Sequence, residues 1–173
     1  MSAAPERYVL DANAFIQAKR RFYGFNFCPG YWHALIWHQQ QGTVCSIDKV
    51  QDELEKGGDD LWEWVERELG NAAFADTSNP AVAGAYGQML AWVMAQPQFL
   101  EAAKSKFQDV ADGWLAAYAK AKGHVVVTLE EYDPVIRKSV PLPNVCRAFD
   151  VECITPFEML RRLNVQFAWQ PPS

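Results

Sequence analysis

The chain has 173 residues, half of them apolar, and it carries a formal net charge of −5 at pH 7. This length and composition predict one globular domain, residues 1–173, with a single sizeable core. A chain this acidic does not offer the broad basic surface that long nucleic-acid duplexes bind. Any contact with nucleic acid should therefore be local.

The N-terminal segment, residues 1–7, lacks the charged and then apolar order of a secretory signal. No apolar run approaches the roughly 20 residues that cross a bilayer. We therefore expect a cytoplasmic protein without membrane contact. The four cysteines have no C-x-x-C spacing and the three histidines have no zinc-ligand spacing, so we expect reduced structural cysteines and no zinc site.

Short apolar runs alternate with helical patterns in the first half of the chain, which is typical of a parallel sheet covered by helices. Asp48 is expected to cap the helix that follows the second strand, and Gly57-Gly58 to end it. The expected elements are, in chain order, a strand at 8–10, helices at 13–19 and 31–41, a strand at 43–47, and helices at 49–56 and 59–69.

The second half continues this alternation. The apolar residues Val82, Tyr86, Met89 and Val93 recur at helical spacing, and the run Val125-Val126-Val127 indicates a central strand that is buried on both faces. The expected elements are a short strand at 74–75, a helix from about 80 to 95, a helical stretch at 99–122 interrupted near Gly113, strands at 125–127 and 152–154, and a helix at 157–163. The tail at 169–173 is expected to be disordered.

Four acidic residues fall where a parallel sheet would gather them: Asp11, Glu53, Asp112 and Glu130. Asp11 and Glu130 follow apolar strands, Glu53 lies about one turn into the helix after the second strand, and Asp112 lies in the helical stretch before the Val125 strand. Ligands of open α/β sheets bind at the carboxyl ends of the strands. Because crowded carboxylates are costly to desolvate, such a cluster indicates a site for a divalent cation and metal-dependent phosphoester chemistry.

Within this cluster we assign Asp11, Asp112 and Glu130 as metal ligands, and Glu53 as a further catalytic carboxylate that holds an ion or a water molecule. Asn13 and Thr128 could orient these ligands or contact a phosphate, since neither adds negative charge. Asp109, three residues before Asp112, shares its helical face in this interpretation but is expected to lie at the surface.

The sequence around each acid resembles a motif of the PIN-domain (PilT N-terminus) nucleases. The first is Tyr8-Val9-Leu10-Asp11-Ala12-Asn13, the second Val50-x-x-Glu53-Leu54, the third Asp112-x-x-Leu115-Ala116-Ala117, and the fourth Val127-Thr128-x-Glu130. The motifs occur in the family's order and cover roughly residues 8–160. The fourth acid is commonly Asp in this family, so the choice between Glu130 and Glu131 stays open. Residues 141–146 are similar to a less-studied branch of PIN-like proteins.

This resemblance implies a three-layer αβα fold with a central parallel sheet of about five strands. It also implies one or two Mg²⁺ or Mn²⁺ ions and cleavage of single-stranded RNA. Many such nucleases are the toxin of a toxin-antitoxin pair, so an antitoxin protein is an expected partner, and a homodimer is one option for the assembly. The alternative is a PIN-like fold that binds without catalysis. A haloacid-dehalogenase phosphatase would need an aspartate where Asn13 stands.

One compact basic cluster, Lys19-Arg20-Arg21, directly precedes the aromatic residues Phe22 and Tyr23. Such a segment could pair phosphate contacts with base stacking. The other interpretation is a solvated helix end, where cations complement the carbonyl end of the helix dipole. Trp114, two residues after Asp112, could likewise stack on a base or serve in packing.

Overall fold

The computed structural model describes residues 4–173 and has a parallel sheet at its centre. The strand order is β3-β2-β1-β4-β5, and all four neighbouring pairs are parallel. The strands are β1 (Tyr8–Leu10), β2 (Val44–Ile47), β3 (Phe74–Ala75), β4 (Val125–Val127) and β5 (Cys153–Ile154). The five expected strands are thus confirmed, and the fold is of the three-layer α/β class that the sequence predicts.

The strand β1 lies in the middle of the sheet, between β2 and β4. Tyr8 pairs with Val44 on one side and with Val125 on the other. All residues of β1 and β4 are buried, as expected for strands that are covered by helices on both faces. Because every strand runs in the same direction, the segments that follow β1, β2 and β4 emerge at one end of the sheet.

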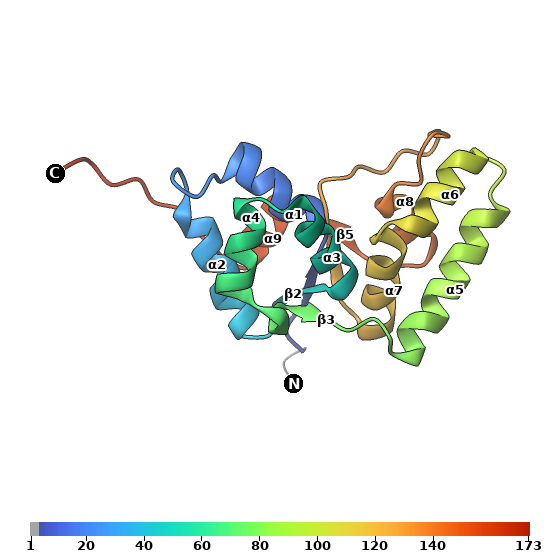
Figure 1. Ribbon diagram of the computed structural model, residues 1–173, viewed down its shortest axis with the longest axis horizontal. Helices are drawn as coiled ribbons and strands as arrows, with labels where there is room; N and C mark the ends of the chain where they lie inside the picture. The colour runs from blue at the N-terminus through green and yellow to red at the C-terminus, as the bar shows by residue number, and fades with distance from the viewer. Residues whose placement is uncertain (1–3) are drawn as a thin grey trace.

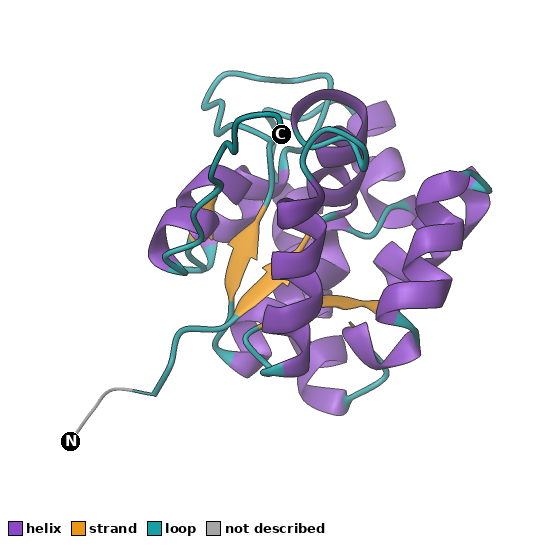
Figure 2. Cartoon of the chain, turned by 90° about the vertical axis from the view of Figure 1, so that its left-hand side faces the viewer, coloured by secondary structure: helices purple, strands orange, loops and turns teal. Residues whose placement is uncertain are grey.

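Helices cover both faces of this sheet. In Figure 1, α2, α4 and α9 lie on one side of the strands and α5, α6 and α7 on the other, and Figure 2 shows the strands between them. Within residues 4–173 the α-helices are α1 (Ala12–Gln17), α2 (Pro29–Gln40), α3 (Asp48–Gly57), α4 (Asp60–Trp64), α5 (Pro80–Ala95), α6 (Glu101–Asp109), α7 (Asp112–Lys122), α8 (Leu142–Ala148) and α9 (Pro156–Arg162). Among them none is both long and apolar enough to cross a membrane.

Two of these helices continue into short π-helical turns, and one tight turn leads into the sheet. The π-helical turns are η1 (Ala18–Phe22) after α1 and η2 (Val65–Leu69) after α4, and the 3₁₀ turn η3 (Asn71–Ala73) precedes β3. The helix expected at 13–19 therefore extends to Phe22, and the basic cluster lies on η1 at its end.

The start of α3 differs from the expectation. Asp48 is the first residue of the helix rather than its N-cap, a position that Ile47 occupies. The Asp48 Oδ1 still accepts a local hydrogen bond from the Lys49 N–H at 2.8 Å. The carboxylate also accepts hydrogen bonds from the hydroxyl and the backbone N–H of Thr77, at 2.7 and 3.3 Å. A tertiary contact with the segment after β3 therefore adds to the local one. Gly58 ends the helix in the left-handed conformation, as its position predicts.

The helical stretch before β4 is two helices, and the break at Val110 and Ala111 lies near Gly113, as the sequence predicts. Gly113 lies in the first turn of α7, where a Cβ atom would come within 2.8 Å of the Tyr86 ring and 3.0 Å of the Phe107 ring. This glycine therefore permits close packing of α7 against α5 and α6. The break also means that Asp109 and Asp112 do not share one helical face.

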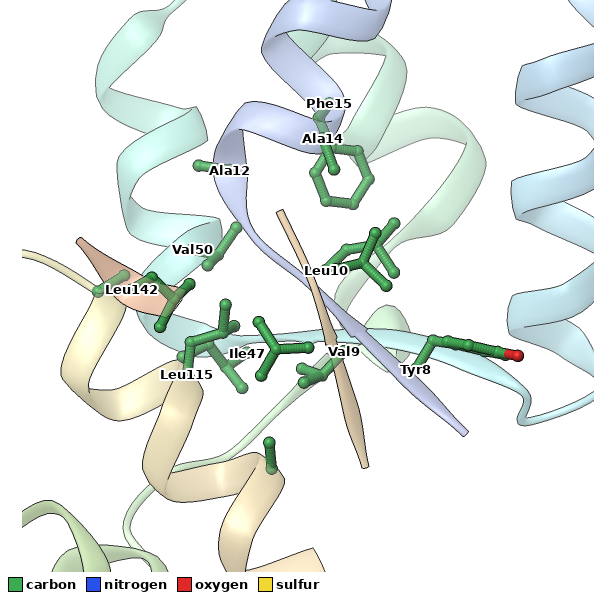
Figure 3. Packing of buried hydrophobic residues seen from close by; sticks show 14 of the residues in the cluster. Tyr8, Val9, Leu10, Ala12, Ala14, Phe15, Ile47, Val50, Leu115 and Leu142 are labelled. Carbon is green, nitrogen blue, oxygen red and sulfur yellow. The ribbon is translucent and has the colours of Figure 1, made fainter. Parts of the chain in front are cut away.

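The core follows the sheet and the helix faces that cover it. Figure 3 shows Val9 and Ile47 of the sheet on the same side of β1 as Leu115 of α7 and Leu142 of α8, while Leu10 points to the other side of the strand. These five side chains are fully buried. At about 25 cal/mol per Å² of apolar surface, burial of each stabilises the fold by about 1.5–3 kcal/mol. This core fixes the ends of β1 and β4 relative to α7.

Candidate active site

A cavity of about 500 Å³ opens at the carboxyl ends of β1 and β4. It lies where β1 passes into α1 and is walled by α1, α3, α6 and the starts of α7 and α8. The four acidic residues that the sequence singles out all contribute to its lining: Asp11, Glu53, Asp112 and Glu130. Asn13 and Glu131 line it as well. The prediction that these acids meet at one end of the sheet describes their placement correctly.

Asp11 is the most enclosed of the four acids, with an exposed fraction of 4%. It follows β1 directly and caps α1, because its Oδ1 accepts a hydrogen bond from the Ala12 N–H at 2.7 Å. Its Oδ2 accepts a second hydrogen bond from the Thr128 hydroxyl at 2.8 Å. The carboxylate is therefore both a helix cap and a wall of the cavity, held in one orientation by β1 and β4 together.

Thr128 and Asn13 connect the ends of β1 and β4 below the cavity. The Asn13 side-chain amide donates to Thr128 Oγ1 at 3.0 Å, and its Oδ1 accepts from the Leu129 N–H at 3.0 Å. Thr128 Oγ1 also accepts from the Glu130 N–H at 3.1 Å. The hydroxyl can donate only once, and the 2.8 Å contact to Asp11 takes that proton. The two neutral residues thus orient Asp11 and Glu130 without adding charge.

Glu53 and Glu130 each use one carboxylate oxygen to hold a neighbouring backbone segment. Glu53 Oε1 accepts from the Ala111 N–H at 3.1 Å, in the break between α6 and α7. Glu130 Oε2 accepts from the Leu142 N–H at 2.8 Å, at the start of α8. Both residues therefore fix the walls around the cavity. Glu131 also lines the cavity but is more exposed than Glu130.

The electrostatics of the site are those of crowded negative charges. Burial raises the pKa of Asp11 to about 7, and the charges of Glu130 and Glu53 add to this, while the Thr128 hydrogen bond opposes it. Burial likewise raises the pKa of Asp112 to about 8, helped by the charges of Asp11, Glu130 and Glu53 and opposed by that of Lys106. Each shift disfavours the ionised carboxylate. The charges of these acids therefore act on one another across the cavity.

The donor chemistry of the cavity suits a hard cation. Its lining contains carboxylate, amide and hydroxyl oxygens and includes no histidine or cysteine within residues 4–173. Oxygen ligands of this kind are those that Mg²⁺ and Mn²⁺ prefer. In the same residues, however, no three His, Cys, Asp or Glu side chains are already arranged to hold an ion. The residue types fit a divalent cation, but closer approach of the carboxylates would be needed to bind it.

Several lining residues were not identified from the sequence. Lys106 and Phe107 come from α6, and Ser139, Val140 and Pro141 come from the segment before α8. The helix α8 itself was not predicted, although proline is compatible with a first helical turn, which is where Pro143 lies. Nothing in the sequence distinguishes Lys106 from an ordinary surface lysine.

Asp109 lies outside the cavity lining. It ends α6, is exposed, and is near enough to Tyr86 for its charge to contribute to the raised pKa of that phenol. The expectation that it lies at the surface is confirmed, and the expectation that it shares a helical face with Asp112 is wrong.

Comparisons with known proteins identify a family and a fold. A family model described as a domain of unknown function, DUF4411, matches residues 8–167. Among solved structures, the chain is similar to one in the crystal structure of VapBC2 from Rickettsia felis bound to a DNA fragment from their promoter. The TM-score is 0.53 at 16% identity, and the match covers 86% of this chain and 97% of that one. No curated protein matches. The likeness supports a PIN-like fold.

Proposed function

The chain belongs to the DUF4411 family, and we propose that it is a metal-dependent endoribonuclease that hydrolyses phosphodiester bonds of single-stranded RNA. The observation that carries the proposal is the convergence of Asp11, Glu53, Asp112 and Glu130 on one cavity at the carboxyl ends of the strands. A fold that only bound a partner would have no need to retain carboxylates whose pKa values are raised by burial and mutual repulsion.

In this proposal Asp11, Asp112 and Glu130 hold Mg²⁺ or Mn²⁺. A bound divalent cation lowers the pKa of water and offsets negative charge on a phosphate that undergoes hydrolysis. Thr128 and Asn13 keep Asp11 in the orientation that presents it to the cavity. Glu53 holds the start of α7, and with it Asp112, by its hydrogen bond to the Ala111 N–H.

The partner that we propose is an inhibitory antitoxin. The similar solved structure is of a VapBC2 complex with promoter DNA, and the acidic cavity of this chain is complementary to an Arg or Lys side chain. A bound cationic side chain would relieve the same repulsion as a metal ion and would block access to it. Copurification with a small protein from the native host, released by competition with millimolar Mn²⁺, tests this partner.

Cleavage of a labelled single-stranded RNA tests the proposed activity. Wild type should cleave with Mn²⁺ and not with excess EDTA, and Asp11→Asn should lose about 10³-fold of this activity, which corresponds to about 4 kcal/mol of transition-state stabilisation. Asp109→Asn is the matched control, since it removes a charge outside the cavity, and it should cleave as wild type does. Circular dichroism verifies that each variant is folded.

Equal cleavage by wild type and Asp11→Asn would contradict the proposed site. If a folded wild type binds RNA but cleaves none with either metal, the protein binds without catalysis.

A further inference from the structure

The wall of the acidic cavity that α6 forms carries an available cation. Ala103, Lys106 and Phe107 lie three and four residues apart, so they share one helical face, and all three line the cavity. Lys106 is exposed and forms no ion pair within residues 4–173. Lys104, two residues earlier, is buried and pairs with Glu101 at 3.0 Å. The two lysines therefore differ. Lys104 serves the fold, whereas Lys106 lines the cavity without a direct ion pair and lies near enough to Asp112 for its charge to lower the pKa of that carboxyl.

A second available cation, Arg20, lies on η1, the turn that continues α1 beyond the opposite wall of the cavity. Asn13 and Ile16 of α1 line the cavity, and Arg20 follows Ile16 by four residues, on nearly the same helical face. Its neighbour Lys19 pairs with Asp60, whereas Arg20 is exposed and forms no ion pair within the described part of the chain.

The segment between β4 and α8 adds cations on the α6 side. Arg137 and Lys138 are exposed and immediately precede Ser139, which lines the cavity. Two hydrogen bonds hold this segment against the start of α6: the Leu100 N–H donates to the Arg137 carbonyl at 2.9 Å, and the Gln98 side chain donates to the Ile136 carbonyl at 2.7 Å. The backbone that carries these cations is therefore held in place next to Ser139 of the cavity lining.

The cations thus flank the acidic cavity on two sides. In Figure 1, η1 and α6 lie on opposite sides of the point where β1 passes into α1. An acidic cavity repels the phosphates of a polyanion, so a strand that crosses it needs cations on both sides of the carboxylates. Phe22, two residues after Arg20, is partly exposed and packs edge-on against Phe157 at 5.1 Å, which leaves an aromatic surface beside the cation.

We propose that Arg20 on one side, and Lys106 with Lys138 on the other, form a phosphate-binding track that carries a single RNA strand across the acidic cavity. The identity of the strand as the substrate of this cavity rests on the proposed nuclease function. Local cations with an adjacent aromatic surface are suited to a flexible single strand, and the net charge of −5 disfavours a long duplex. Lys106 and Arg20 are in this view positioning residues that act on the phosphates next to the scissile one.

Binding measurements in the Asp112→Asn background test the track, because this substitution suppresses cleavage and leaves the cations in place. The affinity for a fluorescent single-stranded oligoribonucleotide is measured by anisotropy in EDTA over a series of NaCl concentrations. Lys106→Ala and Arg20→Ala should each weaken binding on the order of 3- to 10-fold at low salt. Each should also reduce the magnitude of the slope of log K against log [NaCl] by about 0.7, the value for one phosphate contact.

Lys122→Ala is the matched control, because Lys122 is exposed in the last turn of α7, at the other end of the sheet from the cavity. It should change neither affinity nor slope. The track is wrong if the control weakens binding as much as Lys106→Ala does, or if the two track substitutions leave the slope unchanged.

The outcome separates this inference from the proposed activity. Wild-type cleavage of RNA together with unchanged binding by both track variants overturns the track alone. If the two track variants bind RNA more weakly, with the expected change in salt dependence, but the wild type cleaves no RNA, the track is supported and the proposed nuclease function is wrong. A duplex of the same sequence that binds as tightly as the single strand would overturn the single-strand assignment.

Discussion

Two groups of carboxylates in this molecule differ in how their charge is balanced. Near the edge of the sheet, Arg162 of α9 donates hydrogen bonds to three glutamates: Glu6 at 3.1 Å, Glu152 at 2.8 Å and Glu158 at 3.2 Å. At the carboxyl ends of β1 and β4, five carboxylates line a cavity whose lining, within residues 4–173, includes a single cation, Lys106. An arginine therefore neutralises the carboxylates that serve the fold, whereas the candidate active site keeps an excess of negative charge.

This difference indicates what the cavity is for. A buried like-charged cluster destabilises the protein unless something neutralises it, and the raised pKa values of Asp11 and Asp112 reflect that cost. The Arg162 group has no such cost, because its members are partly exposed and paired. We therefore expect the cavity carboxylates and the glutamates around Arg162 to respond in opposite ways when each group loses one negative charge.

The largest expected effect is on activity. Asp112→Asn should reduce Mn²⁺-dependent RNA cleavage by about 10³-fold, because it removes a proposed metal ligand while keeping nearly the same shape. Glu152→Gln removes one negative charge from the Arg162 group and should leave cleavage unchanged. Single-turnover cleavage rates at saturating Mn²⁺ measure both. A loss of equal size in the two variants would show that the cavity has no special role.

Next in size is the loss of the hydroxyl that connects the two central strands. Thr128→Val removes the donor to Asp11 and the acceptor of the Glu130 N–H, and should destabilise the protein by about 1–3 kcal/mol. At this chain length that lowers the melting temperature by roughly 2–4 °C per kcal/mol. Thr128→Ser keeps the hydroxyl and should lose less stability than Thr128→Val. The difference in melting temperature between the two variants therefore measures the contribution of the hydrogen bonds. Equal melting temperatures for the two variants would contradict this role.

A smaller effect concerns pH. The pKa values of Asp11 and Asp112 are about 7 and about 8 in the folded protein, against an ordinary value of 3.8, so the folded state binds more protons between these limits. These two groups therefore favour folding at low pH, and their contribution falls as pH rises through about 7 to 8. In metal-free buffer, the melting temperature of Asp112→Asn relative to wild type should increase from pH 5 to pH 8.5.

Glu152→Gln provides the comparison for this pH series, since it removes a carboxylate that pairs with Arg162 outside the cavity, and its difference from wild type should not follow the same trend. If the melting temperature of Asp112→Asn relative to wild type stays constant or falls as pH rises, ionisation of Asp112 does not destabilise the folded protein.

The smallest effect is expected from breaking the balanced group itself. Arg162→Met releases three glutamates whose side chains are 41–51% exposed, so water can solvate them. Exposed ion pairs typically contribute about 0–1 kcal/mol each, and we expect a total loss of about 1–2 kcal/mol with no change in cleavage. Urea unfolding measures the loss. A destabilisation larger than that of Thr128→Val would reverse the order that we derive.

The sequence predicted the parts of this structure that depend on local pattern. Apolar runs such as Val125–Val127 identified the central strands, and parallel strands bring their carboxyl ends together whatever the details, so the meeting of Asp11 and Glu130 was predictable. The break between α6 and α7 was likewise predicted near Gly113, where the structure has it. The contact of Asp48 with Thr77 was not predictable from local pattern, since Thr77 is 29 residues away in the chain.

The cationic side of the site was not predictable from local pattern. Lys104 and Lys106 are two residues apart in the same helix, and only the tertiary structure shows that one is buried and paired while the other faces the cavity. The choice between Glu130 and Glu131 has a similar origin. Glu130 accepts a hydrogen bond from the Leu142 N–H, which belongs to a helix that the sequence did not predict.

We propose above all that a bound divalent cation, rather than a lysine or arginine side chain, neutralises the carboxylates of the acidic cavity. Calorimetric titration of Mn²⁺ at pH 8 into wild type, Asp11→Asn/Asp112→Asn and Arg162→Met tests it most directly. We predict saturable binding to wild type and Arg162→Met, with a melting temperature that rises in proportion to ln(1 + [Mn²⁺]/Kd), and no binding to the double variant. A folded wild type that binds no Mn²⁺ at millimolar concentration would contradict the account.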